Sequence, residues 1–151
     1  SSLLVRAWFL FTALYLTVCF FFVSVEAKTS EDVILPCRSP SERAIKLLKW
    51  KKQDKDLEGF VFFFRENRSY ESYQIPSFKH RVQLSDPRMK DGDVSVTVKN
   101  VTSSDSGEYE CSFHISRKHR SRRATDFSYT VKLTVVDGES DMKLVVDVTV
   151  T

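Results

Sequence analysis

Apolar and polar residues alternate with a period of two through most of the chain after residue 32, as in half-buried β-strands. The alternation is clearest in Asp93–Val101, Glu108–Ile115 and Ser128–Val136. Turn-forming residues separate the strands, and no stretch of this region keeps a helical period. Seven or more short strands with frequent turns predict an all-β sandwich or barrel. Four further strands are expected, over Asp32–Cys37, Ala44–Lys52, Phe60–Arg65 and Val82–Leu84.

The N-terminal region has a different pattern. An uncharged apolar run covers residues 7–23 and follows Arg6, and small residues stand at Val25 and Ala27. A basic residue before a short apolar run predicts a secretory signal peptide, here residues 1–27, with the domain over 28–137. A membrane-spanning anchor is the alternative, although the run is short for one. Residues 23–26 also alternate like a strand, so the cleavage position stays open.

The C-terminal residues 138–151 contain one more apolar alternation, from Leu144 to Val150. This segment is expected to be a stalk or the start of a further segment. Export predicts an extracellular protein, either secreted or held at the cell surface. Membrane attachment would then depend on an anchor, of the single-pass type, that is not part of this sequence.

The chain has three cysteines, Cys19, Cys37 and Cys111. Removal of the signal peptide would also remove Cys19 and leave an even pair in an oxidising compartment. Two aromatic residues accompany this pair. Trp50 lies one predicted strand after Cys37, and Tyr109 lies two residues before Cys111 in the sequence DSGEYEC.

This Cys…Trp…Tyr-x-Cys arrangement resembles the immunoglobulin fold. The run PSFKHRVQLSDPRMKDGDVSVTVKNVTSSDSGEYEC, residues 76–111, is similar to the V-set domains of butyrophilin-like proteins, T-cell costimulatory ligands and myelin protein zero. The resemblance implies a V-set β-sandwich of two antiparallel sheets with Greek-key topology. Antigen-receptor V domains open their last strand with Gly-x-Gly. Here residues 125–129, TDFSY, contain no glycine, so an antigen-receptor chain is not expected.

The resemblance also implies structural roles for particular residues. Cys37 and Cys111 would form a disulfide between the two sheets, and the indole of Trp50 would pack against it. The hydroxyl of Tyr109 would return to a backbone group near Asp105. Arg81 and Asp105 would form the ion pair that closes one end of V-set sandwiches.

In V-set domains, partners usually bind the outer face of the sheet that contains strands G, F, C and C′. Alternate residues of the predicted strands would form this face, including Lys49, Lys51, Glu110 and His114. The aromatic run after Phe60 can bury only one side of its strand, so an alternate pair of rings should point outward. We take Phe62 and Phe64 as that pair, and coverage of the rings by neighbouring loops is the alternative.

Residues 116–123, SRKHRSRR, hold five Lys and Arg residues, although the net charge of the whole chain is only +3. The positive charge is therefore local, and a general nucleic-acid-binding field is not expected. The segment lies between two predicted strands, where it is either a solvated hairpin tip or a contact for an acidic protein or glycan. The candidate contact residues are Arg117, Arg120, Arg122 and Arg123.

Two sequons for N-glycosylation are present, at Asn67-Arg68-Ser69 and Asn100-Val101-Thr102. Secretion would expose both asparagines to the glycosylation machinery. The alternative is that both are unmodified surface residues. Asn100 follows an outward-pointing lysine at the end of a predicted strand.

Enzymatic chemistry finds little support in the sequence. The three histidines, His80, His114 and His119, lack the spacing of metal ligands, and no glycine-rich phosphate loop or nucleophile motif is present. We therefore expect no catalysis, metal or cofactor. The resemblance implies an immune receptor or ligand that modulates lymphocyte activation by binding a protein counter-receptor. Homophilic adhesion and glycan binding by the basic segment are the alternatives.

Overall fold

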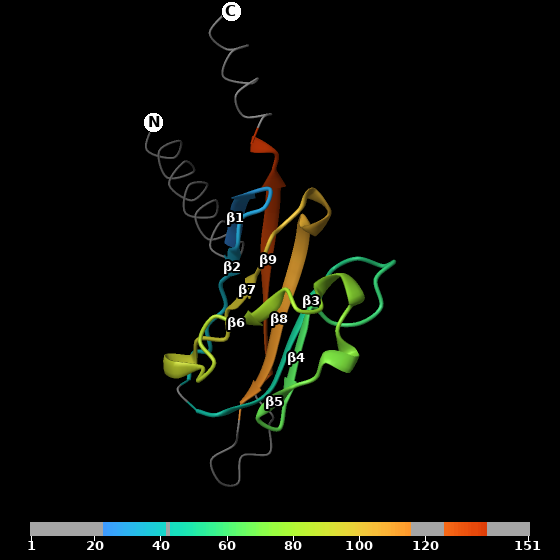
Figure 1. Cartoon of the computed structure of the whole chain (residues 1–151). Coiled ribbons are helices and arrows are strands. Elements are labelled where there is room, and N and C mark those ends of the chain that lie inside the picture. The colour runs from blue at the N-terminus through green and yellow to red at the C-terminus, as the bar shows by residue number, and fades with distance from the viewer. Residues whose placement is uncertain (1–22, 42, 116–125, 139–151) are drawn as a thin grey trace, which may run out of the picture.

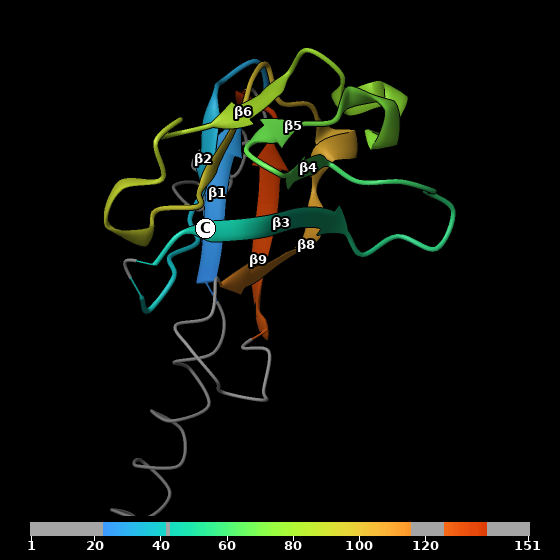
Figure 2. The same cartoon turned by 90° about the horizontal axis from the view of Figure 1, so that it is seen from below.

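The computed structural model describes residues 23–41, 43–115 and 126–138, which form two β-sheets packed face to face (Figures 1 and 2). The predicted all-β sandwich is confirmed. The six-stranded sheet has the order β1 (Val23–Lys28), β9 (Asp126–Val136), β8 (Gly107–Ile115), β3 (Ile45–Lys52), β4 (Phe62–Arg65) and β5 (Arg68–Ser69). The three-stranded sheet has the order β2 (Val33–Leu35), β7 (Val96–Val98) and β6 (Val82–Leu84).

Four short 3₁₀ turns lie between the strands. Two of them, η1 (Glu71–Tyr73) and η2 (Pro76–Phe78), belong to the long connection from β5 to β6. The others are η3 (Lys90–Gly92), before β7, and η4 (Ser103–Asp105), before β8. No helix among the described residues is long and apolar enough to span a membrane.

The chain passes between the sheets after β1, β2, β5 and β7, so sheet neighbours are often far apart in sequence. Most neighbouring strands are antiparallel, as expected. The exception is β1, which runs parallel to β9 from Val23 opposite Val131 to Lys28 opposite Val136. No short hairpin joins β1 to β9, so nothing in the connection imposes an antiparallel direction. The expected signal peptide, residues 1–27, therefore overlaps a paired strand of the domain.

The core lies between the sheets and follows the period-two pattern. Leu48 and Trp50 of β3 are fully buried, as is Tyr109 of β8. The indole N–H of Trp50 crosses to the other sheet and donates a hydrogen bond to the carbonyl of Val94 at 3.0 Å. Cys37 and Cys111 form the expected disulfide, with their Cα atoms 6.6 Å apart. Trp50 and the disulfide therefore link the two sheets near the centre of the sandwich.

The orientation of the phenylalanines in β4 corrects one prediction. Phe62 is paired with Trp50 and Phe64 with Leu48, and both rings are 7% exposed and belong to the core. Phe63, opposite Lys49, points outward instead. Paired residues of neighbouring strands share a face, so the inward Leu48 and Trp50 decide which phenylalanines are buried. Phe62 and Phe64 therefore cannot be surface contacts for a partner.

The DSGEYEC sequence forms the corner between β7 and β8, and the structure shows why these residues occur there. Thr102 and Asp105 form a capping box around η4, in which the carboxylate of Asp105 accepts the backbone N–H of Thr102 at 2.9 Å. The Tyr109 hydroxyl donates to the backbone carbonyl of Asp105. Gly107 has a φ of 146°, and a Cβ there would lie 3.0 Å from the side chain of Lys52. Glycine is therefore favoured by the backbone conformation, and any larger residue would also have to displace the Lys52 side chain.

Candidate functional site

The outer face of the six-stranded sheet consists of the side chains of β3, β4, β8 and β9 that point away from the core. The predicted orientation of Lys49, Lys51, Glu110 and His114 is confirmed, because each alternates with buried neighbours on its strand. Leu47, Ser112, Thr130 and Lys132 share this face. The face thus combines lysines with acidic groups, and it is accessible to a partner.

Glu110 lies near the centre of the outer face and is held in place by its neighbours. Its carboxylate accepts a hydrogen bond from the side-chain amide of Gln53 and another from the hydroxyl of Ser128, both at 2.5 Å. Lys51 lies directly opposite Glu110 on β3. Two hydrogen bonds, one from the residue after β3 and one from β9, fix the carboxylate, so it offers a preformed acceptor to a partner.

His114 lies at the end of the outer face where β8 and β9 begin to diverge. Its Nδ1 atom is 2.6 Å from a carboxylate oxygen of Asp126, the first residue of β9. This pair joins the C-terminal end of β8 to the start of β9. The basic segment that follows His114 lies outside the described residues, and so do its candidate contacts Arg117, Arg120, Arg122 and Arg123.

Four aromatic rings form a cluster at the β5 edge of the outer face, and we call it the aromatic cluster: Phe60, Phe63, Tyr70 and Tyr73. Phe63 is central, with its ring centroid 5.1 Å from Phe60, 5.9 Å from Tyr70 and 5.1 Å from Tyr73. Tyr73 is 54% exposed, and the other three rings are partly exposed. Aromatic side chains in this state are common anchors of protein interfaces.

The sequence reasoning missed Tyr70 and Tyr73 because they lie in a segment with no strand period. The η1 turn explains their position. A 3₁₀ turn has three residues per turn, so side chains three positions apart lie on the same side. Tyr70 and Tyr73 are spaced in this way around η1, and their ring centroids are 5.9 Å apart. The Tyr-x-x-Tyr spacing is the feature of the sequence that could have indicated this contact. It indicates one only if the segment forms a 3₁₀ turn, which the sequence does not show.

The β4–β5 hairpin lies beside the aromatic cluster. Arg65 pairs with Arg68, and the two residues between them, Glu66 and Asn67, have positive φ angles of 52° and 65°. Arg68 places its guanidinium 4.4 Å from the ring centroid of Tyr70. The interaction with Tyr70 raises the pKa of Arg68, which stays charged on this surface. The hairpin therefore presents a fixed cation and an exposed sequon asparagine next to the rings.

The two sequon asparagines lie at opposite ends of the sandwich. Leu47 of β3 is paired with both Arg65 and His114, so the Asn67 turn and the start of β9 share one end. Asn100 lies at the other end, where its backbone N–H donates to Asp32 at 2.9 Å. β9 ends at this second end, because the neighbouring Thr29 and Ser30 donate backbone hydrogen bonds to Val136 and Val101. Both asparagines are exposed, and their glycosylation stays a prediction.

The Arg81–Asp105 ion pair closes the end that carries Asn100. The guanidinium of Arg81 approaches a carboxylate oxygen of Asp105 at 2.5 Å, and it also donates to the backbone carbonyls of Ser77, Lys99 and Asn100. The Asp105 side chain is only 5% exposed. This expected pair is confirmed, and its many backbone bonds indicate a structural role at the end of the fold.

The phenol of Tyr109 is the one strongly shifted titratable group at this corner. Burial raises its pKa well above the ordinary value of 10.0, and the nearby Asp105 carboxylate adds to the effect. Arg81 acts in the opposite direction. The hydroxyl therefore stays protonated and keeps its hydrogen bond to the corner. A group held neutral in this way stabilises the fold and is not poised for proton transfer.

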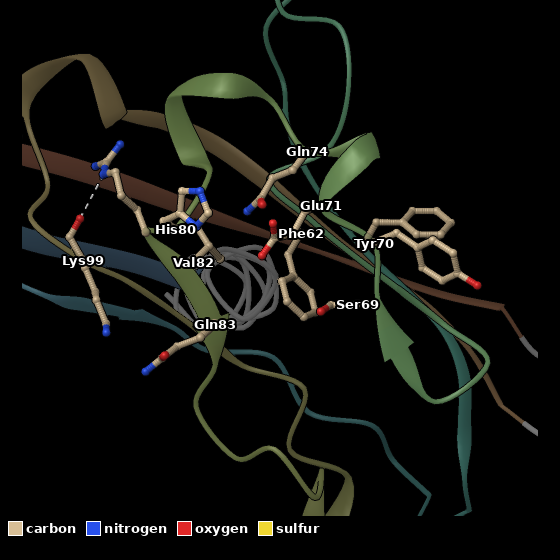
Figure 3. A pocket seen from close by; sticks show the side chains of 11 residues that line it. Phe62, Ser69, Tyr70, Glu71, Gln74, His80, Val82, Gln83 and Lys99 are labelled. Atoms are coloured by element: carbon tan, nitrogen blue, oxygen red, sulfur yellow. Dashed lines mark hydrogen bonds between the residues drawn. The ribbon is translucent and has the colours of Figure 1, made fainter.

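A cavity of about 160 Å³ separates β5 and η1 from β6 (Figure 3). Phe62 forms its floor, and polar groups of Ser69, Glu71, His80 and Lys99 surround it. These groups come from β5, from η1 and from the segments beside β6 and β7, and they do not converge on one point in the close-up view. The cavity therefore marks the place where the two sheets separate at the β5 edge.

A second, more open groove of about 470 Å³ lies at the opposite edge of the sandwich. Val23 and Tyr129 line it from the six-stranded sheet, and Pro36 and Cys37 line it from the other side. Within the described residues, no group of three or more His, Cys, Asp or Glu side chains could hold a metal ion. The outer face with its aromatic cluster is thus the surface that offers the richest set of contacts.

Comparison with known proteins is consistent with this arrangement. The family model described as "Immunoglobulin V-set domain" matches residues 23–136, which is most of the chain. This chain belongs to the immunoglobulin V-set family. The matched region begins at the first residue of β1, so the V-set domain includes the strand that overlaps the expected signal peptide.

The V-set domain is similar to several cell-surface proteins. It is 36% identical to human butyrophilin subfamily 1 member A1 over 89 residues, which cover 58% of this chain and 16% of butyrophilin. It is 30% identical to human junctional adhesion molecule B over 87 residues, which cover 58% of this chain and 24% of that protein. The chain therefore spans only a small part of the length of these relatives.

The crystal structure of bovine butyrophilin has the same fold. Its TM-score against this V-set domain is 0.60, with 29% sequence identity over 77% of this chain and 54% of the butyrophilin chain. The domain is thus related to immune and adhesion proteins of the cell surface, and these relatives are extracellular or held at the cell surface.

Proposed function

We propose that this V-set domain is an extracellular recognition module that binds a protein counter-receptor through the outer face of its six-stranded sheet. Its biological setting would be immune recognition, in which it acts as a receptor or ligand that modulates lymphocyte activation. The relationship to butyrophilin supports this setting. The domain would work by docking and would carry out no catalysis.

The aromatic cluster is the observation that carries this proposal. Packing in the core explains the buried phenylalanines of β4. It does not explain Phe63 and its three neighbours, which remain partly exposed at the sheet edge. Exposed large rings that contact one another cost little conformational entropy when they are covered by a partner. They are suited to be the central contacts of an interface, surrounded by a polar rim.

The polar residues of the outer face would supply that rim. Lys49 is the cross-strand neighbour of Phe63, and Lys51 and Glu110 lie one row further along the sheet. Charges at the rim of an interface mainly steer association and select partners. Lysine and carboxylate side chains are mixed on this face, which favours a counter-receptor whose contact surface also carries both charges.

A binding experiment tests the proposal with matched variants. The secreted domain carrying Phe63→Ser and Tyr73→Ser is expected to lose at least about tenfold in affinity for lymphocytes that bind the wild type. Ile34→Ser is the control, because Ile34 is also 54% exposed but lies on the three-stranded sheet. The proposal is wrong if the control loses binding and the double variant retains it.

Homophilic adhesion is the second candidate, and the relationship to junctional adhesion molecule B favours it. The same outer face would then contact a second copy on another cell. Beads coated with the domain would aggregate with one another in this case, and Phe63→Ser would prevent the aggregation. Binding of an acidic glycan by the basic segment stays a prediction from the sequence, since that segment lies outside the described residues.

A further inference from the structure

The hairpin between β4 and β5 places two arginines directly opposite each other. Arg65, the last residue of β4, is paired with Arg68, the first residue of β5. Arg65 also lies opposite Leu47 of β3, which points outward, so both guanidinium groups belong to the outer face. Like charges that face each other across paired strands are destabilising. The free domain therefore keeps two cations close together at a position where they repel each other.

Neither arginine has a neighbour that satisfies it fully. Glu66, in the turn between them, places Oε1 3.4 Å from Nε of Arg65, and the two side chains are 70% and 60% exposed. Ion pairs this exposed contribute little to stability. Arg68 forms no ion pair with any acidic side chain that the structure describes. A guanidinium has five N–H donors, so both arginines can still donate to a further carboxylate.

The arginines are also held beside the aromatic cluster. The guanidinium of Arg68 lies 4.4 Å from the ring centroid of Tyr70, and the backbone N–H of Tyr70 donates to the carbonyl of Phe63 at 2.9 Å. Arg65 follows Phe63 by two residues on the same face of β4. A side chain that is already fixed loses little conformational freedom when a partner binds it. The rings thus have preformed cationic neighbours on this side.

The shape of the aromatic cluster favours protein side chains over a sugar as its ligand. The ring plane of Phe63 is inclined by 54° to Phe60, by 84° to Tyr70 and by 62° to Tyr73. Phe63 therefore forms no flat platform with any of its neighbours, and a flat platform is what a stacked sugar ring needs. An uneven surface of rings beside two guanidinium groups suits an apolar side chain with a carboxylate next to it.

We propose that Arg65 and Arg68 form a clamp for an aspartate or glutamate of the counter-receptor, next to the apolar group that covers the aromatic cluster. This inference rests on the proposed function, because it names the chemistry of the partner at the same surface. The carboxylate of the partner replaces Glu66 beside Arg65 and accepts hydrogen bonds from both guanidinium groups. Arginine binds carboxylates with a defined geometry, so the clamp selects the partner as well as stabilising the complex.

Glu66 provides a test of the sign of the charge on the partner, because its carboxylate competes for the same arginines. Binding of the secreted domain is titrated on the lymphocytes that bind the wild type. Glu66→Gln should bind these cells up to about threefold more tightly, because the competing carboxylate is gone. A basic group of the partner at this position would have the opposite effect, since Glu66→Gln would then remove its acceptor.

The arginines are tested in the same titration. Arg65→Gln and Arg68→Gln should each lose about tenfold in affinity and bind with a weaker salt dependence than the wild type. Arg65→Lys should recover only part of the loss, because lysine keeps the charge without the fork of donors. Arg88→Gln is the matched control, since Arg88 is an exposed arginine in the connection from β6 to β7 and should bind like the wild type.

Two further measurements separate binding from other effects. The melting temperature of Arg65→Gln should not fall, because the change removes a repelling charge from the free domain. A residue kept for stability would lower it instead. The titrations are repeated with Ser69→Ala in every protein, which removes the sequon at Asn67, so that a glycan on the hairpin does not alter the comparison.

The proposal is overturned if Glu66→Gln weakens binding, or if the arginine variants bind like Arg88→Gln while the Phe63 and Tyr73 double variant loses binding. Loss of binding after sialidase or heparinase treatment of the lymphocytes would also overturn it, in favour of an acidic glycan. The proposed function fails in a different way, in which the Phe63 and Tyr73 double variant binds as tightly as the wild type.

Discussion

Individual side chains at the η4 corner show how single atoms determine local stability. The Tyr109 hydroxyl donates to the Asp105 backbone, and the Asp105 carboxylate both caps η4 and pairs with Arg81. Each buried polar atom therefore has a partner, which avoids the cost of an unsatisfied group. The sequence indicated the tyrosine and its acceptor through the resemblance. It did not indicate Lys52, whose buried ammonium donates to the Ser104 carbonyl at 2.6 Å.

The raised pKa of Tyr109 predicts a stability loss in alkaline solution. Below pH 10 the phenol is protonated in both the folded and the unfolded chain, so its contribution is fully present. Above pH 10 the unfolded chain loses this proton while the folded protein retains it, and the free energy of unfolding falls as pH rises. We expect this decline to be steeper in the wild type than in Tyr109→Phe.

Urea unfolding of the two proteins at several pH values between 8 and about 11 measures the difference. Tyr109→Phe should be less stable by about 1–3 kcal/mol at neutral pH, because the Asp105 carbonyl loses its donor. The difference in the free energy of unfolding between the two proteins should then become smaller as the pH rises above 10. A constant gap would show that the phenol does not retain its proton in the folded state. Comparing the difference removes the contribution of lysines that titrate in the same range.

The strands illustrate how far pattern alone determines an element. The long strands β3, β8 and β9 were predicted almost to their ends, because several alternating residues define each face. β4 has four residues, three of them phenylalanine, so the pattern could not determine which rings are buried. The register with β3 determines it, since Phe62 lies opposite Trp50. If the predicted orientation of so short a strand is off by one residue, every side chain is assigned to the wrong face of the sheet.

The first strand gives a testable consequence for processing of the N-terminus. All six residues of β1 are paired with β9, and Ala27 is buried, so removing the strand would uncover one side of Val131 and Leu133. A chain beginning at Lys28 should be less stable than one beginning at Val23 by at least about 2 kcal/mol. Thermal unfolding of the two secreted versions measures this difference. N-terminal sequencing of the natural product should find that β1 is retained.

Equal melting temperatures for the two versions would contradict this expectation and would restore cleavage after Ala27 as a compatible site. The internal control is Ile34→Ser in the longer version, which changes an exposed apolar residue of β2 without removing a strand. It should leave the melting temperature nearly unchanged.

The molecule as a whole depends on the connection between its two sheets. Cys37 and Cys111 are 74 residues apart in sequence, and their disulfide restricts the unfolded chain over this entire span. In the chain-entropy treatment, closing a loop of this length stabilises a protein by about 4.5 kcal/mol. Trp50 adds contact across the same region through its hydrogen bond to Val94.

Replacing both cysteines by alanine should therefore lower the free energy of unfolding by about 4–5 kcal/mol, with a further small loss from packing. Urea unfolding of the double variant and the wild type checks this value. Retention of the wild-type midpoint in the variant would contradict the stabilising role of the disulfide. Because typical domains are stable by only about 5–15 kcal/mol, the variant is expected to be close to unfolding at body temperature.

The sequence by itself determined the all-β class through its period of two, and its resemblance to immunoglobulin domains implied the disulfide, the central tryptophan and the tyrosine corner, because these depend on residues that the family places at similar spacings. The tertiary structure decided which phenylalanines are buried, the parallel pairing of β1, and the aromatic cluster built from β4 and η1. These features depend on register and on contacts between distant segments. A residue's face on a short strand is set by its neighbour across the sheet, and that neighbour is not encoded in the local sequence.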